Sequence, residues 1–205
     1  MAIPKIEIRY VGEHPTNCYL VENPESQELF IVDPGAEGKK IIEAVGSRKP
    51  TAVLLTHGHY DHIGGADEVC SHFHIPLYVH SEDIPKLTNP LTNGSRLFSQ
   101  DMVTQTKPLP LTDGQRLRLA GFDVTVLHTP GHSRGSCCFL LPEDGGVLCG
   151  DTLFQGGYGR TDIADGNFTD LKKSLRRLIF TLPPQTAYPG HGSTTVAGRA
   201  TSIEL

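Results

Sequence analysis

The stretch AVLLTHGHYDHIGG, residues 52–65, decides the fold. It begins with an apolar run and ends in Gly-Gly, which predicts a loop between a buried strand and a helix. Alternating residues of an extended segment point the same way, so His57 and His59 can bind one metal ion. The turn at Asp61 and His62 then presents ligands to a second ion. A solvated polar loop is the alternative, but the strand-loop-helix context favours a metal site.

The length and composition are those of a soluble enzyme. The chain has 205 residues, of which 38% are hydrophobic and 20% are charged. We expect a single domain over residues 1–205, because this length can bury a substantial core. No apolar run approaches the length of a membrane span, and residues 1–10 alternate like a strand rather than a targeting peptide. A cytoplasmic protein without a membrane partner is therefore expected.

Charge and cysteine content exclude other classes. The net charge is −5 with histidine neutral, and basic residues form no long block, so nucleic acid is not an expected partner. Five cysteines are an odd number without a paired spacing, which argues against a disulfide framework. Cys137, Cys138 and Cys149 lie in apolar runs and are expected to be small buried residues. The sequence leaves the oligomeric state open.

Strand-like runs alternate with helical patterns along the chain. Strands are expected at residues 6–10, 18–21, 29–32, 52–55, 77–79, 116–119, 123–127, 137–141, 147–149 and 186–188, the first three as an antiparallel meander. Helices are expected at residues 39–45, 66–73 and 170–180, and another begins at Ser81 as its N-cap. Residues 87–99 predict a surface loop near the site, either a substrate flap or a passive loop. This order fits two packed sheets with helices on their outer faces.

Three later segments repeat the pattern of a strand that ends in a Gly-flanked polar residue. They are TPGH at 129–132, GDT at 150–152 and PGHG at 189–192. Each is a weak signal alone, because Gly-His is usually a turn and Gly-Asp-Thr an ordinary cap. Together with the first loop, they supply five histidines and two aspartates, which suffice to bind two divalent ions.

With these motifs in this order, the sequence resembles the metallo-β-lactamase superfamily, and within it the glyoxalase II (hydroxyacylglutathione hydrolase) branch. The resemblance extends to NCYLV at 17–21, VDPG at 32–35 and GDTLF at 150–154. It implies an α/β fold, an αββα sandwich of two mixed β-sheets with helices on the outer faces. The site would lie at one edge between the sheets.

The resemblance also implies two groups of metal ligands. The first ion would be bound by His57, His59 and His132, and the second by Asp61, His62 and His191, with Asp151 as the bridging ligand. Zinc is the expected metal, with iron and manganese as alternatives, because imidazole and carboxylate ligands accept all three. A water shared by two cations is ionised near neutral pH and attacks a carbonyl that the metals polarise. Asp61 and Asp151 are therefore the candidate catalytic residues, and Asp61 would orient the nucleophile.

The charge of this site predicts the substrate class. Two divalent ions, two carboxylates and a bridging hydroxide leave a modest positive charge, which suits a small anionic thioester and its tetrahedral oxyanion. Taken with the resemblance to glyoxalase II, this charge leads us to expect hydrolysis of a thioester resembling S-acylglutathione. Only 14 residues follow His191, so the C-terminal helical domain of two-domain glyoxalase II is not expected. Whether glutathione is part of the substrate is left open.

The segment GYGRTD, residues 157–162, leaves alternative functions open. It resembles single-domain glyoxalase II-like hydrolases, but it also occurs in persulfide dioxygenases, which use one iron. Arg160 would bind a substrate carboxylate or form an ion pair with Asp162, and Tyr158 is a second candidate substrate contact. Asp33 would support a ligand histidine or form an Asx turn. A mononuclear-iron persulfide dioxygenase and a non-catalytic, metal-stabilised binding module are the alternative functions.

Overall fold

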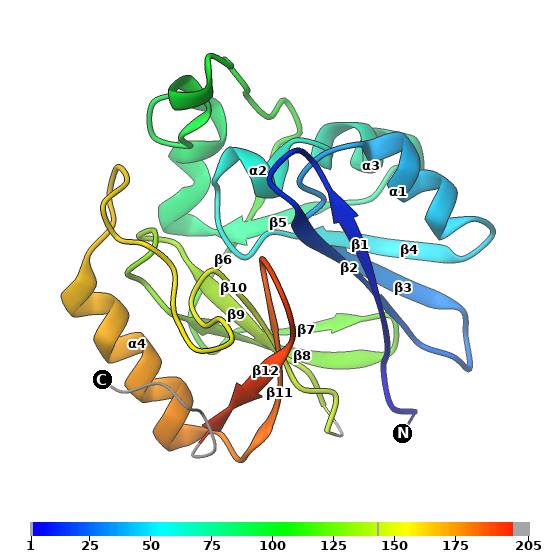
Figure 1. Cartoon of the computed structure of the whole chain (residues 1–205). Coiled ribbons are helices and arrows are strands. Elements are labelled where there is room, and N and C mark those ends of the chain that lie inside the picture. The colour runs from blue at the N-terminus through cyan, green and yellow to red at the C-terminus, as the bar shows by residue number, and fades with distance from the viewer. Residues whose placement is uncertain (1, 143, 199–205) are drawn as a thin grey trace.

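The computed structural model describes residues 2–142 and 144–198, so the predicted extent of the domain to residue 205 stays a prediction. Two six-stranded mixed sheets pack together, and helices cover their outer faces (Figure 1). The predicted αββα sandwich is therefore confirmed. Among the described residues, no helix is both long and apolar enough to cross a membrane.

The first sheet has the strand order β1-β2-β3-β4-β5-β6. Its strands are β1 Lys5–Val11, β2 Thr16–Glu22, β3 Glu28–Val32, β4 Lys49–Leu54, β5 Leu77–His80 and β6 Leu109–Leu111. Strands β1 to β3 form the predicted antiparallel meander, and β3 to β6 run parallel.

The second sheet has the order β12-β11-β10-β9-β8-β7. Its strands are β7 Arg116–Leu119, β8 Phe122–His128, β9 Cys137–Leu140, β10 Val147–Gly150, β11 Gln185–Pro189 and β12 Thr195–Ala197. Strands β10 and β11 are parallel, and the other neighbours are antiparallel.

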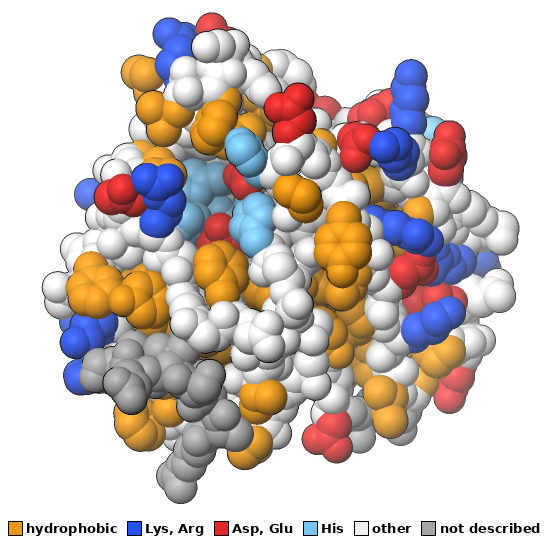
Figure 2. Space-filling model, in the orientation of Figure 1, with side chains coloured by type: hydrophobic (Ala, Val, Ile, Leu, Met, Phe, Trp, Pro, Cys, Tyr) orange, Lys and Arg blue, Asp and Glu red, His pale blue; other side chains and the backbone are white. Residues whose placement is uncertain are grey.

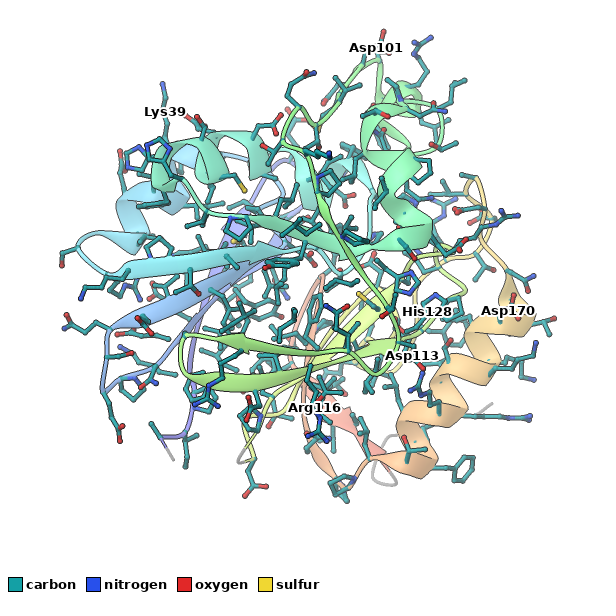
Figure 3. The ribbon with its side chains drawn as sticks, turned by 180° about the vertical axis from the view of Figure 1, so that it is seen from behind. Lys39, Asp101, Asp113, Arg116, His128 and Asp170 are labelled. Carbon is teal, nitrogen blue, oxygen red and sulfur yellow. The ribbon has the colours of Figure 1, made fainter. Side chains whose placement is uncertain are left out.

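Helices cover the outer face of each sheet. The α-helices are α1 Gly38–Val45, α2 Tyr60–Ile63, α3 Ala66–Phe73 and α4 Phe168–Thr181, and two 3-10 helices are η1 Ser81–Thr88 and η2 Ser95–Phe98. Helices α1 and α3 lie on the first sheet and α4 on the second (Figure 1). Arg177 of α4 donates to Asp113 Oδ1 at 2.8 Å and to the His128 carbonyl at 3.0 Å. These bonds fix α4 to the end of β8, where Figure 3 shows Asp113 and His128 from behind.

The apolar pattern of β3 explains the layers. Leu29 and Ile31 pack beneath α1 and α3, whereas Phe30 and Val32 face the space between the sheets. A strand in the middle of the sandwich is buried on both faces, so it is apolar throughout rather than alternating. All five cysteines are free and buried, as the sequence predicted for three of them.

The region after β5 differs from its prediction. Ser81 is not the N-cap, because His80 occupies that position and its Nδ1 accepts from the Glu82 amide at 3.4 Å. Residues 87–99 are only partly a loop, since the end of η1 and all of η2 lie within them. The sequence reading also missed α2, β6 and β12, which have only three or four residues each. So few residues carry no readable periodicity.

Candidate metal centre

The predicted ligands meet at one edge of the sandwich because each follows the carboxyl end of a strand. His57 and His59 follow β4, His132 follows β8, Asp151 follows β10, and His191 follows β11. Figure 2 shows a hollow in which histidine and acidic side chains gather. The structure thus brings together all seven predicted ligand residues, although they come from four separate loops.

The first group consists of three buried imidazoles, those of His57, His59 and His132. His59 Nδ1 and His132 Nε2 lie 2.9 Å apart. Burial and the neighbouring imidazoles lower the pKa of His57 well below its usual range, and that of His59 likewise. Both rings are therefore neutral at physiological pH, which is the form that binds a metal ion.

The second group consists of Asp61, His62 and His191 and is more exposed. Asp61 Oδ2 lies 3.2 Å from His191 Nε2 and 3.9 Å from His62 Nε2. Although burial opposes ionisation, the two imidazoles hold the pKa of Asp61 well below its usual value. Asp61 is thus a carboxylate at neutral pH.

Asp151 lies between the two groups. Its Oδ1 is 3.5 Å from His62 Nε2, and its Oδ2 is 3.5 Å from His132 Nε2. The glycine that precedes His191 makes this approach possible, because a Cβ on Gly190 would lie 2.2 Å from Asp151 Oδ1. One carboxylate therefore faces both groups, as a bridging ligand must.

The donor atoms fit metal ions. Three buried atoms of one cluster, His57 Nε2, His62 Nε2 and Asp151 Oδ1, have no hydrogen-bond partner among the described residues. Buried polar atoms in folded proteins are almost always paired, so unpaired atoms in one cluster need an explanation. Bound cations would satisfy them, and imidazole with carboxylate is a donor set for divalent transition metals.

In four of the five ligand histidines, the Nδ1 atom contacts another group of the protein, whereas the buried Nε2 of His59 has no hydrogen-bond partner among the described residues. The contacts are His57 Nδ1 to Thr56 Oγ1 at 3.1 Å, His62 Nδ1 to Asp33 Oδ2 at 2.9 Å, His132 Nδ1 to the Arg160 carbonyl at 2.7 Å and His191 Nδ1 to the Pro15 carbonyl at 2.8 Å. A carbonyl can only accept, so His132 and His191 donate from Nδ1 and keep Nε2 free for a metal.

Asp33 supports a ligand histidine, which was one of its two predicted roles. Besides His62, its carboxylate accepts from the amide of Thr56 at 2.7 Å and from the hydroxyl at 2.6 Å. Burial alone would lower the pKa of His62, but Asp33 and the two aspartates of the site raise it to about 10 in the metal-free protein, so a metal ion that binds Nε2 would displace a proton. Asp33 therefore connects the second ligand group to the start of the metal loop.

Asp83 is a residue of the site that the sequence reading missed. Its fully buried carboxylate accepts from the amides of Gly58 and Gly135 at 2.8 Å each and from Ser133 Oγ at 2.7 Å. It thus joins the loop of His57 and His59 to the loop of His132. The sequence gives no local signal for this role, because Asp83 looks like any acidic residue in a first helical turn.

The predicted substrate contacts lie outside the ligand cluster. Arg160 donates to Asp162 through two nitrogens, at 2.7 and 2.8 Å, so the ion-pair alternative is present. Arg160 also lines the cavity at the ligand cluster, where a role in binding stays a prediction. Tyr158 packs its ring against Phe168, with 5.7 Å between centroids, and its role as a substrate contact also stays a prediction.

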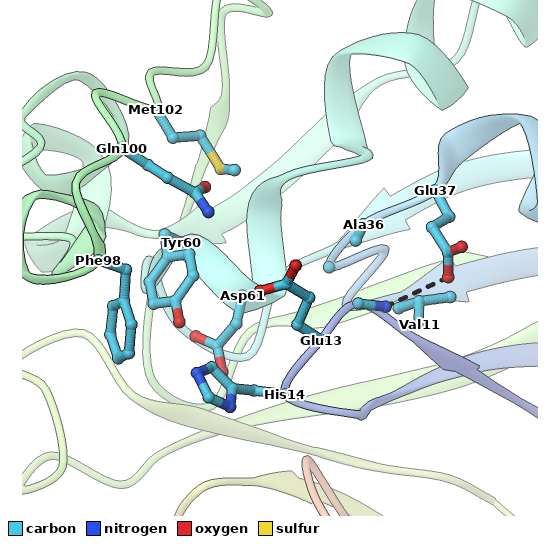
Figure 4. Close-up of a pocket in the computed structure, with 12 residues that line it drawn as sticks. Val11, Glu13, His14, Ala36, Glu37, Tyr60, Asp61, Phe98, Gln100 and Met102 are labelled. Atoms are coloured by element: carbon cyan, nitrogen blue, oxygen red, sulfur yellow. Dashed lines mark hydrogen bonds between the residues drawn. The ribbon is translucent and has the colours of Figure 1, made fainter.

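Two adjoining cavities open beside the ligands. The metal-side cavity, of about 470 Å³, is lined by ligand residues and by Leu97, Phe98, Phe154 and Ile163. The acidic cavity, of about 560 Å³, includes Glu13, Glu37, Gln100 and Met102 in its wall (Figure 4). His14, Tyr60, Asp61 and Phe98 line both cavities, so together they form one cleft.

The fold and this site define a class of protein: an αββα sandwich with a histidine and aspartate metal centre at the edge between its sheets. Residues 11–191 match the model of the Metallo-beta-lactamase superfamily. The chain belongs to this superfamily.

Relatives and solved structures agree with this assignment. "Probable metallo-hydrolase YqgX" of Bacillus subtilis (strain 168) is 38% identical over 189 residues, which is 90% of this chain and 89% of the relative. "Hydroxyacylglutathione hydrolase GloC" of Haemophilus influenzae (strain ATCC 51907 / DSM 11121 / KW20 / Rd) is 33% identical over 199 residues, 95% and 93% of the two chains.

Two solved structures match almost throughout. The BLEG-1 B3 metallo-beta-lactamase has a TM-score of 0.88 at 36% identity and covers 94% of each chain. TTHA1623 in a di-iron-bound form has a TM-score of 0.81 at 35% identity, over 93% of this chain and 94% of its own. The superfamily and the ligand cluster together imply that the chain binds divalent metal ions.

Proposed function

We propose that this protein is a binuclear metal-dependent hydrolase that cleaves a thioester. The observation that carries the proposal is the completeness of both ligand groups, which Asp151 joins. A mononuclear iron enzyme needs only one such group, and a metal-stabilised binding module does not need ligand residues that line a cleft, as Asp61, Asp151 and His191 do here. The similarity to a protein named hydroxyacylglutathione hydrolase favours a thioester over other carbonyl substrates.

Two zinc ions are the proposed cofactors, with iron as the principal alternative because a similar structure holds two irons. His57, His59 and His132 would hold one ion, and Asp61, His62 and His191 the other. When bound, the ions would polarise the substrate carbonyl and lower the pKa of the attacking water.

The protein residues would position the reactants. Asp61 is ionised and faces both cavities, so its carboxylate can accept a hydrogen bond from the attacking water and orient it. Asp151 faces the same space from between the two groups. Asp33 keeps the His62 ring in place, so the geometry of the second group does not depend on the substrate.

The proposed partner is a small thioester rather than a macromolecule, because the reacting groups lie in a cleft that suits a small molecule. We propose a cytoplasmic location. An S-acylglutathione is one member of the substrate class, and the test below includes other thiols.

The test is metal removal followed by restoration. The protein would be stripped with a chelator, reloaded with zinc or iron, and assayed against glutathione and coenzyme A thioesters, a lactone and a β-lactam. Thioester hydrolysis that is lost and regained with the metal is expected. Absence of thioester hydrolysis across the panel would reject the proposal, and turnover of the β-lactam alone would assign the function suggested by the name of BLEG-1.

Metal analysis of protein purified anaerobically without added metal distinguishes the proposed hydrolase from a mononuclear-iron persulfide dioxygenase. Two ions per chain and no oxygen uptake are expected. One iron per chain with persulfide-dependent oxygen uptake would instead establish a persulfide dioxygenase.

A further inference from the structure

Two exposed apolar side chains of η2 border the metal centre. Leu97 is 70% exposed and Phe98 is 48% exposed, although both line the metal-side cavity with the ligand residues. Phe154 and Ile163 belong to the wall of the same cavity. Figure 2 shows apolar side chains bordering the hollow that holds the histidines. These four side chains are called the apolar wall below.

The chain around η2 is built to hold this surface in place. The fully buried Asn93 donates to the Met102 carbonyl at 2.8 Å and accepts from the Ser95 amide at 2.9 Å. Its carbonyl accepts from the Tyr60 amide at 3.0 Å, directly beside a metal ligand. The Phe98 ring lies 5.0 Å from the Tyr60 ring. These contacts anchor the chain around η2 and the Phe98 ring beside the metal loop.

The other half of the cleft has the opposite chemistry. The acidic cavity carries the carboxylates of Glu13 and Glu37, of which Glu37 is paired with Lys40, and none of the described residues that line this cavity is Lys or Arg. In the metal-side cavity, the charge of Arg160 is compensated by its paired contact with Asp162. The cleft is thus apolar on one side of the metal centre and acidic on the other.

A thioester has two arms that extend from its carbonyl group, one acyl and one on sulfur. Burying methylene groups on a preformed apolar surface is favourable, and ligand sites commonly combine apolar walls with a few polar groups. We propose that the apolar wall binds an unbranched apolar chain and that this chain is the acyl group of the substrate. Its assignment as an acyl group rests on the proposed thioester hydrolysis.

The first experiment is an acyl-length series, from acetyl to octanoyl, on one thiol with zinc-loaded protein. In the wild type, kcat/KM should rise about two- to fourfold for each methylene that becomes buried. Leu97→Ser should flatten this rise. Leu91→Ser is the matched control, because Leu91 is 67% exposed near η2 but lines neither cavity, and it should keep the wild-type rise.

The second experiment measures binding without turnover. Alkyl hydroxamates of increasing length, which attach to metal ions through their head group, would be titrated into the loaded protein by calorimetry. Affinity should rise with chain length in the wild type and in Leu91→Ser, and much less in Leu97→Ser.

The two experiments separate failure of the inference from failure of the proposed function. If no thioester is cleaved but hydroxamate affinity rises with length through Leu97, the hydrolase proposal fails and the apolar wall stands. The apolar wall is not a binding surface if hydroxamate affinity and kcat/KM of the wild type do not change with chain length. The same conclusion follows if the wild type and both variants show the same dependence on chain length. Equal flattening in both variants would also overturn the inference.

Discussion

Replacing Asp83 with Asn tests whether the metal centre depends on a residue that touches no metal ligand side chain. The Asp83 carboxylate accepts three hydrogen bonds, from two backbone amides and one hydroxyl. Its Oδ2 serves Gly58 and Ser133, and its Oδ1 serves Gly135. An asparagine in the best orientation keeps its oxygen on the first pair and turns its amide group toward the third donor.

The expected loss of stability follows from the contact between the new side-chain amide group and the third hydrogen-bond donor. One charge-assisted bond is lost, and the buried amide of Gly135 is left facing another donor, which together cost about 2–4 kcal/mol of the free energy of unfolding. The loop of His132 would then be held to residue 83 by one hydrogen bond instead of two, so its position relative to the loop of His57 and His59 would be less well fixed. Changes to groups that hold metal ligands typically lower metal affinity by about 10- to 100-fold, and a loss in that range is expected for the first ion.

Urea unfolding of the metal-free protein would measure the stability, and competition with a chelator would measure the two metal affinities. Asp67→Asn is the control, because Asp67 accepts from the amides of Gln105 and Thr106 at 2.8 Å each, without contact to the ligand loops. It should lower stability without changing metal affinity. The reasoning is refuted if Asp83→Asn loses stability but binds both ions as tightly as the wild type does.

Three further predictions concern other parts of the molecule. Gly190→Ala should lower metal content and activity by more than about tenfold, because its Cβ would lie 2.2 Å from Asp151 Oδ1; unchanged metal content would contradict this. Burial and the neighbouring His128 lower the pKa of His80, so the unfolded chain binds a proton more readily below the ordinary pKa of about 6.5. The stability of the metal-free wild type should therefore fall more than that of His80→Asn between about pH 7.5 and about pH 5.5, as measured by urea unfolding. Arg160→Ala should raise KM for an anionic thioester if Arg160 binds substrate, whereas an unchanged KM with lower thermal stability would leave it only the ion pair.

The ligands were predictable because each one carries a local signal. The end of strand β4 lies in the readable apolar run of residues 52–55, and His57 and His59 follow it at a spacing that only a few arrangements explain. His132 and His191 could be found because a glycine precedes each of them at a strand end. Local residue patterns therefore predicted the sandwich and the inventory of its metal centre.

The features that could not be predicted depend on contacts between segments that are distant in the sequence. A local residue pattern carries no information about such contacts. Asp83 is separated from Ser133 by 50 positions, and its role exists only because two loops meet there. Helix η2 has four residues and begins after Gly94 in the left-handed region, so it carries no apolar periodicity. The sequence does not indicate the apolar wall either, because its local pattern predicts a loop for the segment that contains Leu97 and Phe98.

The difference in exposure between the two ligand groups indicates where a substrate approaches. The three histidines of the first group are almost fully buried, whereas His191 and Asp61 of the second expose 30% and 21% of their side chains. The strand that a ligand follows does not set this difference, because the more exposed Asp61 follows the same strand β4 as the buried His57 and His59. Asp61 lines both halves of the cleft, so its ionised carboxylate is accessible from either half. The buried group is therefore shaped to hold an ion, and the exposed group is also shaped to meet a substrate.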